Sequence, residues 1–238
     1  MSDTLLDVQN LTMKFGGLVA IDDLTFSAKK DNITSIIGPN GAGKTTVFNC
    51  LTGFYKATAG SMYLNKDDNK MDLKKFSDFK VAQKAGVART FQNIRLFPQM
   101  SVLENMMVAQ HNKLMKASGF SILGLINSKS YLQQEKEAME ISKYWLDIIG
   151  LTNRADDNAG DLPYGDQRKL EIVRAMCIEP HLLCLDEPAA GLNAKESAEL
   201  NKLLKFIKND KKTGILLIEH DMSVVMAISD HVVVLNYG

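Results

Sequence analysis

The clearest chemistry in this sequence lies between Gly38 and Thr46, in the run Gly-Pro-Asn-Gly-Ala-Gly-Lys-Thr-Thr. Gly38, Gly43, Lys44 and Thr45 have the spacing of a Walker A phosphate-binding loop. Glycines remove the Cβ atoms that would keep successive backbone N–H groups from turning inward onto phosphate oxygens. The lysine can reach the β and γ phosphates, and the threonine hydroxyl can be a ligand for Mg²⁺. The run therefore predicts a binding site for a nucleoside triphosphate.

The segments on either side of this loop favour the same interpretation. Residues 33–37 form an apolar run that predicts a buried strand, and residues 47–51 predict the first turns of a helix. A helix that begins at the loop presents unpaired N–H groups and about half a positive charge to the bound phosphate. An ordinary glycine turn is the alternative, and these flanking elements make it the poorer explanation. The residues assigned to nucleotide binding are Gly38, Pro39, Asn40, Gly41, Ala42, Gly43, Lys44, Thr45 and Thr46.

Polar residues follow several other predicted strands at the point where each strand ends. The predicted strands are residues 86–91, the apolar run from 182 that ends in Asp186 and Glu187, residues 213–218 and residues 232–235. In open parallel sheets, ligands bind at the carboxyl ends of the strands. We therefore expect Gln92, Asp186, Glu187 and His220 to lie beside the glycine-rich loop.

These polar residues are of the types that phosphoryl transfer to water requires. Asp186 has the Walker B position, whose acid orients Mg²⁺, commonly through the water shell of the metal. Glu187 can accept a proton from the attacking water or orient it, and a structural ion pair is the alternative role. His220 can donate to γ-phosphate oxygens, and Gln92 can ligate Mg²⁺ or hold the water. The prediction is that Glu187, His220 and Gln92 are catalytic, and that Thr45, Gln92 and Asp186 hold the metal.

The first part of the chain predicts antiparallel strands over residues 5–11 and 19–28, where apolar and polar residues alternate. A further short strand is predicted over residues 60–64. Phe15 precedes the second of these strands and could stack on a purine ring, although a core aromatic fits the pattern equally well. Residues 65–75 are rich in charge and predict a solvated loop that runs into a helix ending near residue 85.

The character of the sequence changes between residues 101 and 150, where helical spacing of apolar residues predicts helices over 104–114 and 135–149. The pattern suggests a helical lobe inserted into an α/β core. The apolar stretch 119–126 is interpreted as internal packing of that lobe, with a docking surface as the alternative. A glycine turn at residues 162–167 then leads into a helix predicted over 168–178.

Composition limits the classes of function that remain. Lys plus Arg equals Asp plus Glu at 28 each, so the charge balance does not predict nucleic acid as a partner. No apolar run approaches the roughly 18 residues that span a bilayer, and the N-terminus does not resemble a signal peptide. The 3 cysteines all fall in apolar segments and predict core residues in a reducing compartment. We expect a cytosolic chain, or one on the cytosolic face of another assembly.

The motifs taken together resemble those of ABC-transporter ATPases, and the resemblance covers nearly the whole chain. In order along the chain, the matching elements are Phe15, the Walker A run, Gln92, the signature turn at residues 162–166, Asp186 with Glu187, Asn193 and His220. The runs Tyr164-Gly165-Asp166-Gln167-Arg168 and Leu-Ile-Glu-His-Asp-Met at 217–222 are similar to the LivG-type ATPases of bacterial high-affinity branched-chain amino acid importers.

This resemblance implies an α/β P-loop NTPase with a RecA-like parallel core sheet, an antiparallel β subdomain and an inserted α-helical subdomain. It places one nucleotide-binding domain over residues 1–238, with the catalytic core at about 1–92 and 163–238 and the helical subdomain at about 93–162. It also implies ATP and Mg²⁺ as cofactors. Tyr164, Gly165 and Asp166 would contact the γ phosphate of an ATP bound to the partner ATPase subunit, since the helix that follows points its N-terminus there.

The implied assembly lies on the cytoplasmic face of the inner membrane. Its other members are a second ATPase, LivF-like or an identical copy, two transmembrane permease subunits and a periplasmic amino-acid-binding protein, with no nucleic acid. Two departures from the family pattern weaken parts of this picture. Pro163 stands where a serine or small residue is usual, so a hydroxyl donor to the γ phosphate is missing, and Asn193 replaces an aspartate.

Two other functions are compatible with a P-loop. One is a soluble ABC ATPase acting in DNA repair or translation, but such proteins usually carry two nucleotide domains or a long coiled-coil insert, and the lobe of about 50 residues here is too short for one. The other is a regulatory module that binds nucleotide without turnover, which the presence of Glu187 and His220 argues against. An ATPase that powers import of branched-chain amino acids is the function the sequence favours.

Overall fold

The computed structural model describes residues 3–66, 69–77, 80–112 and 129–238. The chain divides into two compact units. The first is formed by Met1–Gln92 together with Pro180–Gly238, and the second is Asn93–Glu179. The sequence prediction assigned residues 163–179 to the catalytic core, whereas their contacts group them with the helical unit.

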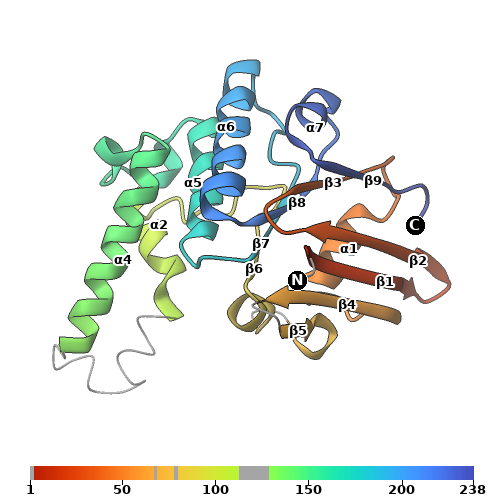
Figure 1. Ribbon diagram of the computed structural model, residues 1–238. Coiled ribbons are helices and arrows are strands. Elements are labelled where there is room, and N and C mark those ends of the chain that lie inside the picture. The colour runs from red at the N-terminus through yellow and green to blue at the C-terminus, as the bar shows by residue number, and fades with distance from the viewer. Residues whose placement is uncertain (1–2, 67–68, 78–79, 113–128) are drawn as a thin grey trace. The chain divides into compact units, whose positions relative to one another are not determined.

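The first unit contains a five-stranded parallel sheet with the strand order β6-β7-β8-β3-β9 (Figure 1). The strands are β3 Ile33–Ile37, β6 Val87–Arg89, β7 Leu182–Asp186, β8 Gly214–Ile218 and β9 His231–Val234. Every residue of β7 and β8 is buried, which explains why these strands are continuous apolar runs in the sequence. The predicted parallel core sheet is therefore confirmed.

The same unit also contains a four-stranded antiparallel sheet with the order β2-β1-β4-β5. Its strands are β1 Thr4–Phe15, β2 Leu18–Lys29, β4 Ala59–Lys66 and β5 Asn69–Asp72. The prediction of a loop over residues 65–75 was wrong, because β5 pairs with β4 from Asn69 to Asp72. Lacking an apolar face, this edge strand gives no period-two signal. The predicted helix ending near residue 85 is reduced to a 3₁₀ turn at Leu73–Lys75 and a π turn at Val81–Ala85.

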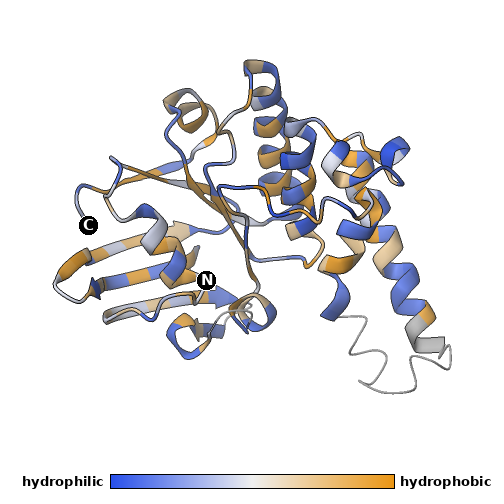
Figure 2. Ribbon diagram, turned by 180° about the vertical axis from the view of Figure 1, so that it is seen from behind, coloured by the Kyte–Doolittle hydropathy of each residue, from blue (hydrophilic) through white to orange (hydrophobic). Residues whose placement is uncertain are grey.

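Among the described residues of the first unit, the α-helices are α1 Lys44–Leu51, α6 Ala194–Lys211 and α7 Met222–Ile228. Helix α6 begins at a capping box in which Asn193 and Glu196 exchange side-chain to backbone hydrogen bonds of 2.9–3.0 Å. In Figure 2, α6 carries both hydrophobic (orange) and hydrophilic (blue) residues. The buried residues of α6 are Leu200, Leu203, Leu204 and Ile207. Sequence analysis missed α6 and α7.

One apolar core joins the two sheets of this unit. It draws on β1, β2 and β4 of the antiparallel sheet, on α1, and on β7 and β8 of the parallel sheet. Phe48 and Leu51 of α1 are fully buried in it. Because α1 follows the glycine-rich loop directly, this burial fixes the loop relative to both sheets (Figure 1).

The second unit is helical over the part that the structure describes. Its helices are α2 Val102–Ala109, α4 Lys129–Ile148 and α5 Tyr164–Met176, with short 3₁₀ turns at Thr152–Arg154 and Ala159–Asp161. A capping box between Ser101 and Glu104 starts α2. Helix α5 begins four residues earlier than predicted, because Pro163 takes the N-cap position and the turn residues are already helical. The apolar stretch 119–126 lies outside the described residues.

Among the helices that the structure describes, none is long and apolar enough to cross a membrane.

Candidate nucleotide-binding site

The loop at residues 38–43 connects β3 to α1 and depends on two of its glycines for its shape. Gly38 and Gly43 have φ values of 151° and 94°, which L side chains rarely adopt. A Cβ at Gly38 would lie 2.2 Å from the carbonyl oxygen of Leu235, and one at Gly43 would lie 2.5 Å from that of Ala20. The backbone of this loop is therefore packed against β2 on one side and the segment after β9 on the other.

Lys44 is the first residue of α1, and its side chain folds back over the loop. Its Nζ donates to the carbonyl oxygens of Gly38 at 2.8 Å and Pro39 at 3.0 Å. Burial lowers the pKa of Lys44, while the negative charges of Glu187 and Asp186 oppose that shift. The ammonium is thus held in the concave side of the loop, where a phosphate would be its natural counter-charge.

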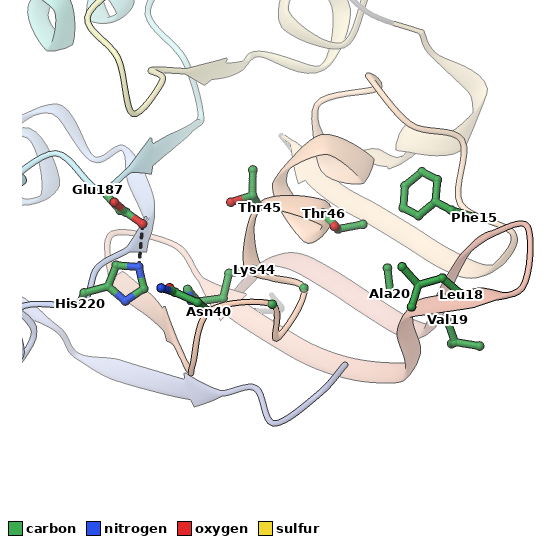
Figure 3. Close-up of a pocket in the computed structure, with 12 residues that line it drawn as sticks. Phe15, Leu18, Val19, Ala20, Asn40, Lys44, Thr45, Thr46, Glu187 and His220 are labelled. Atoms are coloured by element: carbon green, nitrogen blue, oxygen red, sulfur yellow. Dashed lines mark hydrogen bonds and ion pairs between the residues drawn. The ribbon is translucent and has the colours of Figure 1, made fainter.

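A cleft of about 360 Å³ opens over this loop and is lined wholly by residues of the first unit. Figure 3 shows Phe15, Leu18 and Ala20 on one side of it, Thr45 and Thr46 in the middle, and Glu187 with His220 on the other side. The lining also includes Val19, Asn40, Gly41, Gly43 and Lys44. An apolar end and a polar end joined by a phosphate-binding loop match the shape of a nucleotide.

Phe15 forms the apolar end of the cleft. It is the last residue of β1, its side chain is 41 % exposed, and its ring meets Tyr55 edge to face at a centroid distance of 5.1 Å. This exposure argues against the core role that the sequence left open. A supported aromatic ring with an open face is suited to stacking on a base.

Glu187 stands at the polar end, and the structure brings all three predicted catalytic residues together there. Oε2 of Glu187 accepts a hydrogen bond of 2.7 Å from Nε2 of Gln92, and its Oε1 lies 2.6 Å from Nε2 of His220. Glu187 has a positive φ of 48°, and its N–H donates to the carbonyl of Ile218 at 2.9 Å. A glutamate in this left-handed conformation costs of order 1–2 kcal/mol, and such strain concentrates at functional sites.

Gln92 reaches Glu187 from a position that the sequence placed wrongly. The strand predicted to end at residue 91 ends at Arg89, so that Gln92 belongs to the irregular segment that follows β6. This segment carries Gln92 to the end of the neighbouring strand β7, where Glu187 follows Asp186. The position of Gln92 is therefore set by a loop, and its side-chain nitrogen donates a hydrogen bond to Glu187.

Asp186, the predicted Walker B acid, is buried at the end of β7. Its Oδ2 lies 2.9 Å from a guanidinium nitrogen of Arg89, and both side chains are almost fully buried. Burial raises the pKa of Asp186, while the hydrogen bond and positive charge of Arg89 oppose that shift. Sequence analysis gave Arg89 no role, although a charged residue within a predicted strand of the core sheet was a signal that it has a partner.

Glu219 is a second functional candidate that sequence analysis did not assign. It is buried between the loops that carry Glu187 and His220, and burial raises the pKa of its carboxyl group. Its Oε1 accepts from the backbone N–H of Ala189 at 2.7 Å, and its Oε2 from that of His220 at 3.2 Å. Glu219 thus joins the backbones of the two loops that hold Glu187 and His220.

The residues of the cleft fit a nucleotide-bound Mg²⁺ better than a free metal ion. Among the residues that the structure describes, no three His, Cys, Asp or Glu side chains are grouped to hold a metal by themselves. Mg²⁺ prefers oxygen donors and usually keeps waters, so that one or two protein oxygens beside phosphates suffice. Thr45 lines the cleft and supplies a hydroxyl oxygen of this type. Asp186 precedes the lining residue Glu187, and Gln92 is hydrogen-bonded to Glu187; their carboxylate and amide oxygens are further donors of this type.

The three predicted signature residues open helix α5 in the second unit, whereas the cleft is built from the first unit. Tyr164 is 44 % exposed, and its hydroxyl accepts a hydrogen bond of 3.1 Å from Arg168. Asp166 forms an ion pair of 2.9 Å with Lys169. Pro163 takes the N-cap position and offers no side-chain acceptor to the N–H groups at the start of α5.

Comparison with known proteins gives a consistent result. A family model described as ABC transporter matches residues 21–190. The chain is 50% identical to the high-affinity branched-chain amino acid transport ATP-binding protein LivG of Escherichia coli K12 over 238 residues, covering 100% of the chain and 90% of the relative. It is 48% identical, with the same coverage, to BraF of Pseudomonas aeruginosa, which has the same description.

Solved structures support the assignment of the fold. The ADP conformation of an ATP-binding cassette of an ABC transporter superposes with a TM-score of 0.83 at 31% identity, covering 100% of this chain and 89% of that one. A nucleotide-free cassette superposes with a TM-score of 0.80 at 30% identity, covering 99% and 88%.

Proposed function

Because the chain belongs to the ABC transporter family as an ATP-hydrolysing subunit, we propose that it powers high-affinity uptake of branched-chain amino acids across the inner membrane. The solute in this proposal comes from the two relatives at 48% and 50% identity, which share one description over the full length of this chain. The geometry of the cleft bears on the nucleotide and not on the solute, and it supports hydrolysis of ATP at this site.

The observation that carries the proposed chemistry is Glu187 clamped between Gln92 and His220 at the end of β7. In the proposed step, Glu187 orients a water molecule and accepts its proton while the water oxygen bonds to the γ phosphorus and the bond to the ADP oxygen breaks. His220 donates to the γ-phosphate oxygens, and Lys44 offsets the charge that shifts toward ADP. The hydroxyl of Thr45 and the carboxylate of Asp186 would hold Mg²⁺, which would stabilise the negative charge of the phosphates.

Nucleotide recognition in this proposal uses the full length of the cleft. The purine stacks on Phe15, the phosphates follow residues 38–46, and the γ phosphate ends beside Glu187 and His220. Stacking on an aromatic ring discriminates little between bases, because every base has a π-face. We therefore expect the cleft to bind ATP chiefly through its phosphates. Gln92 contacts Glu187 through its side-chain nitrogen and is therefore placed to report whether a γ phosphate is present.

The proposed assembly pairs this chain with a second ATPase subunit, LivF-like or identical, on the cytoplasmic face of the membrane. ATP bound to one subunit would contact Tyr164, Gly165 and Asp166 at the start of α5 in the other, with the helix N-terminus directed at the γ phosphate. ATP then bridges the two subunits, and hydrolysis removes the bridge. Two permease subunits convert this opening and closing into transport, and a periplasmic binding protein delivers the amino acid to them.

Purification of the tagged chain from detergent-solubilised membranes tests this proposal. We expect a second ATPase and two permease subunits to co-purify, and we expect vesicles of this complex to take up radiolabelled leucine only with ATP and a loaded binding protein. Uptake of leucine should disappear in the Glu187→Gln complex although the subunits still assemble. Co-purification with ribosomal or DNA-repair proteins and no permease would contradict the proposal and favour a soluble ATPase.

A further inference from the structure

Arg89 of β6 is a buried arginine in direct contact with the predicted metal-binding acid. Its guanidinium donates to Oδ2 of Asp186 at 2.9 Å, and the two side chains are 7% and 6% exposed. The other terminal nitrogen donates to Oδ1 of Asn49 at 2.5 Å and lies 3.4 Å from the hydroxyl of Thr52. Arg89 therefore joins the end of β7 to the helix that carries the phosphate-binding loop.

The aromatic residues around Arg89 limit how it can move. The guanidinium carbon lies 4.9 Å from the ring centroid of Phe91, 5.6 Å from that of Phe48 and 5.8 Å from that of Phe54. Cation–π contacts of this kind strengthen when the cation is desolvated. The guanidinium of Arg89 is thus held by aromatic rings on several sides and by polar partners at both terminal nitrogens. This in turn restricts rotation of the Asp186 carboxylate that it contacts.

The same segment contacts both neighbouring acids. Arg89 is bonded to Asp186, and Gln92, three residues further on, is bonded to Glu187. A movement of this segment therefore acts on both carboxylates together. The segment begins at Arg89, the last residue of β6, and continues into the irregular stretch that contains Gln92.

We propose that Arg89 is a positioning residue for the metal site: it fixes the carboxylate of Asp186 for a nucleotide-bound Mg²⁺ and ties it to helix α1. The proposal rests on the function proposed above, in which Asp186 serves Mg²⁺. Because Arg89 donates to Oδ2, the other carboxylate oxygen of Asp186 would be the one that serves the metal. Groups that orient a metal ligand from behind commonly change metal affinity 10- to 100-fold when they are removed.

A purely structural role would predict a different result. The pairing of β6 with β7 already includes the register Arg89 to Cys184 and a backbone hydrogen bond of 3.0 Å from Thr90 to Cys184. An ion pair that merely reinforced this pairing would affect thermal stability and leave the metal affinity of the folded protein unchanged. A third role, in which Arg89 competes with the metal for Asp186, would make metal binding tighter when the arginine is removed.

The test is the affinity of the full chain for Mn²⁺ in the presence of a non-hydrolysable ATP analogue, measured by electron paramagnetic resonance. Nucleotide affinity is measured in parallel with Mn²⁺ and with EDTA, because the ratio reports the coupling between metal and nucleotide. The variants are Arg89→Gln, Arg89→Lys and Asn49→Ala. The matched control is Arg154→Gln, which removes an ion pair of 2.7 Å with Asp157 in the other unit.

We expect Arg89→Gln to weaken Mn²⁺ binding by about 10- to 100-fold while nucleotide affinity in EDTA stays within about twofold of native. Arg89→Lys keeps the charge and should recover part of the loss, which also provides a readout if the glutamine variant does not fold. Asn49→Ala should give a smaller loss in the same direction, and Arg154→Gln none. Native-like or tighter Mn²⁺ binding in a folded Arg89→Gln variant, or in both Arg89→Lys and Asn49→Ala, would overturn the inference. Failure of the native chain to bind Mn²⁺ with nucleotide would instead contradict the proposed metal site.

Discussion

Replacement of Glu187 by glutamine isolates the chemical role of its carboxylate, because the structure predicts that the fold tolerates the change. A carboxamide has nearly the same size and keeps one acceptor oxygen, which can accept from Gln92 as the carboxylate does at 2.7 Å. Its nitrogen can donate to an unprotonated His220, whose Nε2 lies 2.6 Å from Glu187. Since both contacts can be kept, we expect a change of at most about 1 kcal/mol in the free energy of unfolding.

The catalytic loss should be much larger than the loss of stability. A positioned general base contributes typically about 10²- to 10⁴-fold, and each factor of ten corresponds to about 1.36 kcal/mol of barrier. Removing the base from Glu187 should therefore raise the barrier to hydrolysis by about 2.7–5.4 kcal/mol. Because neither contact involves the phosphate-binding loop, affinity for ATP should stay within about threefold of native.

Phosphate release by the purified chain, at concentrations where the native protein turns over, measures this effect. Equilibrium binding of a fluorescent ATP analogue, in the same buffer, measures affinity. The matched control is Glu196→Gln, an identical chemical change in the capping box of α6, outside the residues that line the cleft. Turnover of Glu187→Gln within threefold of native, with normal folding, would refute the assignment of Glu187 as the base.

Three further predictions concern the loop, the apolar end of the cleft and the cysteines. Gly43→Ala should lower the free energy of unfolding by at least about 1–2 kcal/mol and weaken ATP binding. The reason is that φ of Gly43 is 94° and the new Cβ would lie 2.5 Å from the carbonyl oxygen of Ala20. Native-like melting and ATP titration curves would contradict this prediction. Phe15→Ala should weaken ATP binding by about 5- to 150-fold (about 1–3 kcal/mol), whereas Phe15→Trp should keep it; equal affinities in a fluorescence titration would exclude stacking. Burial raises the pKa of the Cys50 thiol to about 11 and that of the Cys184 thiol to about 12, so both stay protonated through pH 8. Both should therefore react with a thiol reagent only in denaturant. Rapid modification of these two thiols in the native chain would contradict this prediction.

The phosphate-binding loop and the parallel strands could be predicted from sequence because their signals are local. The loop needs glycines at fixed spacing, and buried parallel strands are continuous apolar runs such as β7 and β8. The charged edge strand β5 gave no such signal, since it is set by pairing with β4 rather than by an apolar face. Helix α6 did carry a local signal, the capping residues Asn193 and Glu196, which sequence analysis passed over because Asn193 was considered only as part of a family motif.

The sequence could predict which residues form the site, but not which of them contact one another. Asp186, Glu187 and His220 could be brought together by the rule that strands of a parallel sheet end at one edge. The ion pair between Arg89 and Asp186 joins residues 97 positions apart in the sequence, and nothing local to either residue specifies it. The positive φ of Glu187 is likewise fixed by the backbone hydrogen bond to Ile218 on the neighbouring strand, which only the fold supplies.

A crystal structure of the Glu187→Gln variant with ATP and Mg²⁺ is the most direct test of the central claim, that this cleft holds ATP for hydrolysis. The account predicts the triphosphate along residues 38–46, the adenine ring against Phe15, and the γ phosphate within hydrogen-bond distance of Lys44 and His220. ATP bound outside this cleft, or with its γ phosphate pointing away from residue 187, would contradict the account.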